Sequence, residues 1–323
     1  MYYCIVNPSA RSGKGKEIWD KLERTFKAKG LEFKVKFTKG PGHATVLARS
    51  ITSAQRDQSD SPVKLVVMGG DGTLNEAING ITDFENTLLG YIPIGSSNDF
   101  SRDLGFPKDP QKLVDKIIEG KEVRRLDLGK LTYNSMSDTM SRLHQENIST
   151  TRMFDVSSGI GFDAAVCEEA LSSHTKNFLN KIGLGKLTYG SIAIRQLLGA
   201  KKVPCDLELD DGTKLHLDHF LFVVAMIHHH QGGGFNLAPT ADLSDGLFDL
   251  IVIGNMSKPA MFRALPMAYV GKHYGIKGVY HYTAKSFSIK TSEPLWVHTD
   301  GEVSVKSDNL SMECLQNKLH LMV

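Results

Sequence analysis

The segment "VVMGGDGTLNEAINGI", residues Val66 to Ile81, joins an apolar, β-branched run to a helical pattern through Gly69-Gly70-Asp71-Gly72. Glycine has no Cβ, so a strand that ends in such a loop lets a phosphate approach main-chain N–H groups at the positive end of a helix. The fingerprint G-x-G-x-x-G of dinucleotide-binding folds is absent, and no Gly-Lys-Ser/Thr follows as in a P-loop. The loop therefore indicates a nucleotide site in neither of these two common folds.

The first 128 residues alternate short apolar runs with amphipathic helical patterns. The spacing predicts strands at "YYCIV", "EFKVKFT", "VKLVVMG" and "LLGYIPI", with helices at "GKEIWDKLERTFKAKG", "GHATVLARSITSA", "LNEAINGI" and "DPQKLVDKIIEG". This order is typical of an α/β domain with a doubly wound parallel sheet, whose ligand loops follow the carboxyl ends of the strands. Three loops are therefore expected to converge: Asn7 to Lys16, Thr38 to His43 and Gly69 to Asn75.

After Asp127 the pattern changes to strand-like runs separated by turn residues, such as "RMFDVSSGIGF", "GLFDLIVIG" and "KLHLMV". Helical stretches interrupt them near 164–180, 187–200 and 258–274. Such a series predicts a mostly antiparallel second domain. The polar stretch at 134–151 is expected to be an exposed hairpin loop or insertion.

Composition narrows the class of protein. An apolar content of 41% with 23% charged residues is ordinary for a soluble globular protein, and a net charge of +2 does not argue for nucleic acid. No stretch resembles a signal peptide or approaches eighteen uninterrupted apolar residues, so a cytoplasmic protein without a membrane span is expected. Four cysteines without C-x-x-C spacing predict reduced core thiols: Cys4, Cys167, Cys205 and Cys314.

Six motifs occur along the chain in the order "NPSARSGKG", "GGDGTLNEAING", "PIGSSNDFSRDLG", "SSGIGFDAAV", "GGGFNLAPTADLSDGLFDL" and "TDGE". Together they resemble the diacylglycerol kinase catalytic-domain family of bacterial lipid kinases, which is related to sphingosine and ceramide kinases. The resemblance covers nearly the whole chain and implies two domains. These are an α/β nucleotide-binding domain at 1–127, to which a last strand at about 305–323 returns, and a β-sandwich lipid-substrate domain at 128–304.

The first domain would hold ATP. Asp71 would repel a phosphate directly, so its carboxylate makes chemical sense beside Mg²⁺ or on ribose or water. The alternative is a tight turn in which Asp71 and Thr73 only cap the helix and Glu76 only complements its dipole. Where the family usually has threonine in "PIGSSNDF", Ser96 keeps the hydroxyl. The resemblance implies nucleotide binding by Asn7, Thr38, Gly69, Gly70, Asp71, Gly72, Thr73, Leu74, Asn75, Glu76, Ser96 and Asn98.

The transfer of a phosphate to a lipid hydroxyl needs a base. By resemblance, Glu302 of "TDGE" is this base, and Asp300, with Asp71, helps to position metal or nucleotide. The alternative is that Asp300-Gly301 is only a β-turn, because Asp-Gly is a common hairpin dipeptide.

A metal site is expected at "ADLSDGLFDL", where Asp242, Asp245 and the Leu247 carbonyl offer hard oxygen ligands for Mg²⁺. The alternative is an acidic turn without an ion. The residues His228 to His230 follow a strand and alternate between its faces, so they are not expected to converge on one metal ion. A loop near the lipid cleft is the favoured interpretation of this histidine run.

The resemblance implies an ATP- and Mg²⁺-dependent lipid kinase that phosphorylates a diacylglycerol-like hydroxyl to a phosphatidate-like product. Its lipid would come from a membrane, with the enzyme peripheral at the inner face, and Asp163 of "GIGFDA" would lie near the substrate or only cap a helix. A soluble kinase of the NAD kinase type and a non-catalytic lipid-binding relative are the alternatives. Diacylglycerol, a sphingoid base, a polyprenol and a glycolipid all stay open as substrates, and a homodimer is compatible with the resemblance.

Overall fold

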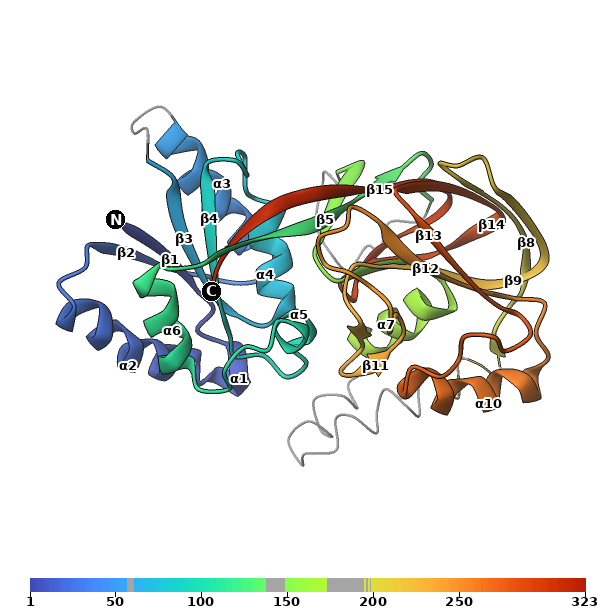
Figure 1. Ribbon diagram of the computed structural model, residues 1–323, viewed down its shortest axis with the longest axis horizontal. Helices are drawn as coiled ribbons and strands as arrows, with labels where there is room; N and C mark the ends of the chain where they lie inside the picture. The colour runs from blue at the N-terminus through green and yellow to red at the C-terminus, as the bar shows by residue number, and fades with distance from the viewer. Residues whose placement is uncertain (57–60, 138–148, 173–194, 196, 198) are drawn as a thin grey trace. The chain divides into compact units, whose positions relative to one another are not determined.

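The computed structural model describes residues 1–323 except 57–60, 138–148, 173–194, 196 and 198 (Figure 1). The chain divides into two compact units: Met1–Leu128 with Gln316–Val323, and Gly129–Leu315. Most of the insertion expected at 134–151 and of the helix expected at 187–200 lies outside the described residues.

The first unit contains a parallel sheet in the order β4-β3-β1-β2. Strands and helices alternate along the chain, as the apolar pattern predicts. The strands are β1 (Tyr2–Val6), β2 (Phe33–Phe37), β3 (Val63–Gly69) and β4 (Thr87–Pro93), and the helices are α1 (Ala10–Gly13), α2 (Gly15–Ala28), α3 (His43–Arg56), α4 (Asp71–Ile78), α5 (Asp99–Asp103) and α6 (Pro110–Glu119).

Helices lie on both faces of this sheet (Figure 1). Alternate residues of β1, including Cys4, face one core with Trp19 and Phe26 of α2 and Ile117 of α6. Burial of these aromatic and aliphatic side chains is the main force that holds the two helices to the sheet. The helices α3 and α4 pack against each other and against β3.

The second unit is rich in antiparallel strands, as predicted. Two shorter strands, β7 and β8, lie between β9 and β14, and each of them pairs with both. Beyond β9 the sheet continues with β12 and then β13. The elements that begin in or belong to this part of the chain are β5 (Val123–Tyr133), β6 (Thr151–Phe154), β7 (Ser157–Gly161), α7 (Phe162–Ser172), β8 (Val203–Leu209), β9 (Lys214–Met226), β10 (His230–Gln231), β11 (Phe235–Asn236), β12 (Phe248–Gly254), α10 (Lys258–Tyr269), β13 (Val279–Ala284), β14 (Ser286–Thr299) and β15 (Glu302–Met322).

The last strand, β15, belongs to both units. Its first part pairs with β14, whereas His320 and Leu321 pair in parallel with Leu88 and Leu89 of β4. The sequence suggested that the return begins near 305, but the second unit extends to Leu315, because the antiparallel pairing with β14 reaches Glu313. The chain end thus completes the edge of the parallel sheet beside β4.

All four cysteines are free thiols in the structure, and Cys4, Cys205 and Cys314 are buried. Burial raises the pKa of Cys4 to about 12, and burial with the nearby Asp206 carboxylate raises that of Cys205 to about 12. In the described parts of the chain, we find no helix whose length and apolar content would let it span a bilayer.

Candidate functional site

The loops after β1 and β3 meet at the first turn of α4. Asn7, directly after β1, donates from Nδ2 to the Thr73 hydroxyl at 2.9 Å. The Asn7 Oδ1 accepts the Ser9 N–H at 3.0 Å, which fixes the amide orientation. Because parallel strands end at the same edge of a sheet, residues 66 positions apart become neighbours here. Two of the three loops expected to converge are therefore in direct contact.

The glycines of these loops allow backbone segments to approach closely. A Cβ on Gly69 would lie 2.5 Å from the Thr73 Cβ, and a Cβ on Gly95 would lie 2.6 Å from the Gly70 Cα. The loops after β3 and β4 therefore pass each other with no side chain between them. Gly70 is the extended N-cap of α4, so the first N–H groups of this helix lie beside bare backbone. This arrangement offers main-chain donors and a helix N-terminus to an anion.

Asp71 joins the start of α4 to the loop after β4. Its Oδ2 accepts the Asn98 N–H at 2.8 Å. Asn98 has a left-handed backbone with φ 52°, and its Nδ2 donates to the Gly95 carbonyl at 3.0 Å. Asparagine tolerates this backbone region better than most residues, which gives a local reason for its presence here. Asp71 thus fixes the relative position of two glycine loops in addition to supplying a negative charge.

Glu76 serves a different helix from the one that carries it. Its carboxylate accepts the Gly42 N–H at 2.8 Å and the Ala44 N–H at 3.1 Å, at the start of α3. The alternative that Glu76 only complements the dipole of α4 does not describe these contacts. Through them Glu76 holds the loop after β2, which begins at Thr38.

The remaining predicted nucleotide-binding residues of this unit differ in exposure. Leu74 and Asn75 are fully buried in α4, so Leu74 can offer a ligand only its backbone. Ser96 is exposed in the loop after β4, where its hydroxyl is accessible.

In the second unit, Asp300-Gly301 forms the turn of a two-residue hairpin between β14 and β15. Thr299 pairs with Glu302 across it, and both turn residues have positive φ, 50° and 81°. A type I′ hairpin requires this geometry, and Asp-Gly is a preferred sequence for it. The expectation of a β-turn is therefore correct for the backbone. Glu302 is exposed at the first position of β15.

The Asp300 carboxylate anchors this turn to the start of β7. It accepts the N–H groups of Asp155 at 3.0 Å and of Val156 and Ser157 at 2.9 Å each. The Asp300 N–H in turn donates to the Ser157 carbonyl at 2.8 Å. These four bonds fix the position from which Glu302 projects.

Asp163, at the start of α7, is the centre of a polar network. Its Oδ2 lies 2.7 Å from His298 Nε2, and its Oδ1 accepts from Gln231 Nε2 at 2.9 Å. The Gly301 N–H donates to His298 Nδ1 at 3.3 Å, and the other ring nitrogen, Nε2, faces Asp163. The contacts link Asp163 to the hairpin turn, whereas the alternative of a helix cap involves neither partner.

The environment keeps Asp163 ionised. The His298 side chain is fully buried, and that of Asp163 is 15% exposed. Burial by itself raises the pKa of Asp163, but attraction to His298 and the hydrogen bonds from His298 and Gln231 bring the pKa below its ordinary value. A Cβ on Gly159 would lie 2.9 Å from both the Asp163 Oδ2 and the His298 Nε2, which explains the glycine in "SSGIGF".

An apolar cavity of about 150 Å³ lies beside this network. Its walls come from α7, β9, β12 and α10, with Phe162, Leu221, Ile251 and Met261 among the lining residues. Polar side chains are few in its lining, and they include Asp163, Gln231 and His273. A mostly apolar cavity with a small number of polar groups is typical of a site for a hydrophobic small molecule.

The acidic turn before β12 carries the residues that are expected to bind a metal ion. Asp242 Oδ1 accepts the Ser244 N–H, and Asp245 Oδ1 accepts the Leu247 N–H, each at 2.9 Å. Burial raises the pKa of Asp245, and the nearby carboxylates of Asp242 and Asp249 raise it further. Carboxylates that repel one another in a partly buried turn suit a hard divalent cation.

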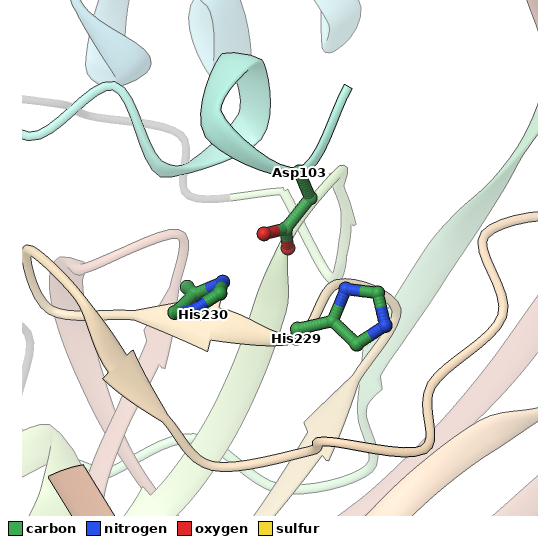
Figure 2. A group of neighbouring side chains, drawn as sticks. All are labelled: Asp103, His229 and His230. Atoms are coloured by element: carbon green, nitrogen blue, oxygen red, sulfur yellow. The ribbon is translucent and has the colours of Figure 1, made fainter. Parts of the chain in front are cut away.

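The three histidines of the run do not all converge, as the sequence predicts. A ring nitrogen of His229 and one of His230 lie within 4.8 Å of each other, whereas His228 does not belong to this group. The ring centres of His229 and His230 lie 6.2 Å apart with an interplanar angle of 66°, on the segment that leads into β10 (Figure 2). Figure 2 also labels Asp103, the last residue of α5 in the first unit. His228 is buried.

Two family models match the chain. Residues 1–131 match the diacylglycerol kinase catalytic domain, and residues 156–323 match the YegS C-terminal NAD kinase beta sandwich-like domain. A diacylglycerol kinase from Staphylococcus saprophyticus is 30% identical over 308 residues, which cover 94% of this chain and 88% of that protein. The chain therefore belongs to the diacylglycerol kinase catalytic-domain family, as its six motifs predict.

Other relatives agree. A diacylglycerol kinase from Bacillus subtilis is 28% identical over 307 residues, which cover 92% of this chain and 88% of that protein. The crystal structure of a diacylglycerol kinase from Bacillus anthracis strain Sterne matches with a TM-score of 0.71 at 25% identity, over 99% of this chain and 96% of the other. The similarity thus extends over both units of the chain.

The residues that sequence reasoning missed are His298 and Gln231. His298 stands two positions before Asp300 in "VHTDGE", and Gln231 follows the histidine run. A histidine close to a suspected catalytic turn was the available signal for the first, whereas Gln231 carried no local signal.

Proposed function

We propose that this chain transfers the γ-phosphate of ATP to the hydroxyl of a diacylglycerol-like lipid and so produces a phosphatidate-like product. Membership of a lipid kinase family supports the class of reaction. The observation that carries the proposal is the connection in the second unit from an apolar cavity, through Asp163 and His298, to the turn that precedes Glu302. An apolar cavity suits a lipid chain, and a carboxylate near its polar end suits proton transfer.

The first unit would bind the nucleotide. The glycine loops cross at Gly70 and Gly95 so closely that a Cβ on Gly95 would collide with the Gly70 backbone, and they do so at the N-terminus of α4. Main-chain N–H groups there would bind phosphate oxygens, with Asn7 and Ser96 as further polar contacts. Asp71 would face a Mg²⁺ ion carried by the triphosphate, since its carboxylate would repel bare phosphate.

In the proposed reaction, the Glu302 carboxylate accepts the proton of the lipid hydroxyl while the hydroxyl oxygen attacks the γ-phosphorus. The bond from that phosphorus to the bridging oxygen breaks, and ADP leaves with the electron pair. Asp300 acts as a positioning residue, because three backbone N–H groups hold its carboxylate and fix the turn. Asp163 would bind the polar end of the lipid with Gln231.

The acidic turn fits a second Mg²⁺. Asp242 and Asp245 each use Oδ1 for a backbone N–H, so the opposite oxygens and the Leu247 carbonyl would hold the ion. No Lys or Arg of the described residues forms an ion pair with either carboxylate, so a cation would relieve their repulsion. Mg²⁺ there would supply charge neutralisation that shapes the turn.

A substrate of this kind resides in a bilayer, so we propose that the protein acts as a peripheral enzyme at the inner face of a membrane. The test is incubation of the purified chain with labelled ATP, Mg²⁺ and a panel of micellar lipids together with NAD. Label in diacylglycerol or another lipid alcohol supports the proposal and identifies the lipid. Label in NAD would instead favour a small-molecule kinase, and no label in any compound would favour a non-catalytic lipid-binding relative.

A further inference from the structure

The helix α10 and the residue that follows it carry both cavity-lining and exposed apolar side chains. Its residues Met261, Ala264, Leu265 and Ala268 line the apolar cavity at helical spacing. Met267, Tyr269 and Val270 at its C-terminal end are instead exposed to 37%, 50% and 53%. The other exposed large hydrophobic side chains in the described parts of the chain are isolated in sequence: Met1, Val46, Val123 and Met136. Scattered exposed apolar residues need no explanation, but three within four residues do.

The backbone holds this apolar end in a fixed geometry. Gly271 has φ 70°, its N–H donates to the Ala268 carbonyl at 3.3 Å, and the Lys272 N–H donates to the Met267 carbonyl at 2.8 Å. These two bonds form a Schellman motif, which ends a helix at a defined residue. The exposed apolar side chains therefore stand on a rigid helix end and not on a frayed terminus.

The sequence on both sides of this helix carries charge of one sign. The 43 residues from 250 to 292 contain six Lys or Arg and no Asp or Glu, although the whole chain has a net charge of only +2. Arg263 within α10, and Lys272 and Lys277 just after it, are exposed. Exposed apolar side chains flanked by basic residues match the two layers of an anionic bilayer surface, the acyl boundary and the negative headgroups.

The exposed helix end is also connected to the cavity wall. The Tyr269 ring packs edge-on against Phe235 of β11, with 5.3 Å between ring centres, and Phe235 lines the cavity. Figure 1 shows α10 beside β11 in the second unit. Only the Tyr269 side chain thus separates the exposed helix end from a residue of the cavity lining. A lipid that left a bilayer at this helix end would have a short path to the cavity.

We propose that the surface formed by Met267, Tyr269, Val270, Arg263, Lys272 and Lys277, here called the α10 surface, docks on an anionic lipid bilayer and admits lipid to the cavity. The inference rests on the proposed function for the identity of the cavity's ligand, but the docking itself is independent of catalysis. Exposed apolar side chains beside basic residues favour an anionic membrane over an acidic protein, because a membrane offers an acyl layer directly beneath its negative headgroups.

Vesicle sedimentation tests the docking. The full chain is incubated with vesicles of phosphatidylcholine alone, or of phosphatidylcholine with about one third phosphatidylglycerol. We expect binding to the anionic vesicles only. The double variant M267S/V270S should lose on the order of tenfold in affinity, since each half-exposed side chain would otherwise enter the acyl boundary. K272Q/K277Q should lose about fivefold in vesicle affinity for each positive charge removed. Added salt should weaken the binding of the unchanged chain in the same way.

Matched controls lie in the first unit. V46S removes an exposed valine of α3, and K108Q/K112Q removes two exposed lysines near α6, so both should bind vesicles like the unchanged chain. Equal losses in the controls, or unchanged binding in M267S/V270S, would overturn the proposal. So would a dimer of the unchanged chain that M267S/V270S converts to monomer, because the α10 surface would then join two copies of the chain.

Activity measurements separate this inference from the proposed function. Neither Met267 nor Val270 lines the cavity, so M267S/V270S should phosphorylate a short-chain, monomeric diacylglycerol at the rate of the unchanged chain. On anionic vesicles its turnover should fall with its binding. A chain that binds vesicles through the α10 surface but phosphorylates no lipid would refute the kinase proposal and uphold the docking. Equal turnover on vesicles by variant and unchanged chain would refute the docking alone.

Discussion

The two units build their candidate sites in different ways. In the first unit, the contacts that shape the site come from backbone and from loops at one edge of a parallel sheet, with Gly70 and Gly95 as the points of closest approach. In the second unit, the site is a network of side chains from three distant segments, joined at Asp163. A site of the first kind leaves contiguous motifs in the sequence, whereas a site of the second kind leaves single residues.

This difference also determines what a substitution can change. A glycine loop is fixed by sterics, so removal of a charge near it alters ligand binding and leaves the fold in place. A buried network is fixed by its own hydrogen bonds, so removal of one member leaves the others without partners.

The largest effect, on turnover, is expected for Asp71→Asn in the first unit. Asparagine can still accept the Asn98 N–H through its Oδ1, so the crossing of the two glycine loops is kept. The negative charge for Mg²⁺ is lost, and turnover should fall to background. The measurement is labelled-phosphate transfer beside a thermal melt of the same preparation. Wild-type turnover in a folded variant would remove Asp71 from the mechanism.

Glu302→Gln should give the next largest effect. Glutamine keeps the volume and the hairpin register but cannot accept the proton of a hydroxyl, and typical losses of a general base are on the order of 10²- to 10⁴-fold in rate. The affinity for ATP, measured by calorimetry, should hardly change. The matched control is Glu313→Gln, an exposed glutamate of the same strand, which should retain full turnover.

If Glu302 serves only the hairpin, turnover in Glu302→Gln will fall by no more than a few-fold. The base would then have to be sought at Asp71 or Asp300. Because three backbone N–H groups already hold Asp300, its substitution would also loosen the turn, and a melt would reveal this.

Local chemistry explains what the sequence could predict. Apolar periodicity located the parallel strands and the antiparallel strands that follow Asp127, because burial sets both patterns. The glycine loop at Gly69 was recognisable since only glycine permits its close contacts. The Asp-Gly turn was recognisable for the same reason, as it needs positive φ at two successive residues.

Contacts between distant residues explain what the sequence could not predict. Nothing near Glu76 indicates that its carboxylate binds Gly42 and Ala44, 34 and 32 residues away. Nothing near Asp163 indicates His298, 135 residues later in the chain. Such pairs depend on strand order and register, which pattern alone does not determine. The roles of these residues in catalysis stay predictions.

Asp163→Asn tests the network of the second unit. Both partners donate to Asp163, so the amide NH₂ of asparagine would face a donor. We expect the free energy of unfolding at pH 7 to fall by about 1–3 kcal/mol. Urea unfolding, followed by Trp296 fluorescence in a shared Trp19→Phe background, would measure it. An unchanged free energy would show that the network does not stabilise the unit.

The free energy of unfolding should also depend on pH in a direction set by the ionisation of Asp163. The pKa of Asp163 is below its ordinary value, so the carboxylate stabilises the fold above about pH 4, and this contribution is lost as pH falls through the folded-state pKa. The difference between wild type and Asp163→Asn should therefore shrink below about pH 4. A constant difference would mean that ionisation of Asp163 does not contribute.

A smaller effect is expected at the acidic turn. If Asp242 and Asp245 hold Mg²⁺, a concentration ten times the dissociation constant should stabilise the wild type by about 1.4 kcal/mol, and a chelator should reverse this. Asp245→Ala should lose most of that gain. The control is Asp211→Ala, because Asp211 accepts the Thr213 N–H in the same local geometry as Asp245 and Leu247. Equal Mg²⁺ responses in both variants would count against an ion at the turn.

The smallest effect concerns His273, a buried imidazole in the cavity lining. Its ring packs edge-on against the Tyr274 ring, with 4.9 Å between ring centres. Burial lowers the pKa of His273, and His281 lowers it further, against the opposing effect of the Leu237 carbonyl. The folded chain therefore holds this side chain neutral at a pH where the unfolded chain protonates it.

The sign of the pH effect follows from this order of proton binding. Below about pH 6.5 the unfolded state binds the His273 proton first, so the free energy of unfolding falls with decreasing pH. His273→Leu removes the titrating group and keeps an apolar side chain against the cavity. Its free energy of unfolding should match or slightly exceed that of the wild type at pH 7.5 and exceed it by about 1 kcal/mol more at pH 5.5. His219→Leu, at an exposed position of β9, should leave the pH dependence unchanged, and equal slopes for all three proteins would show that burial of His273 has no cost.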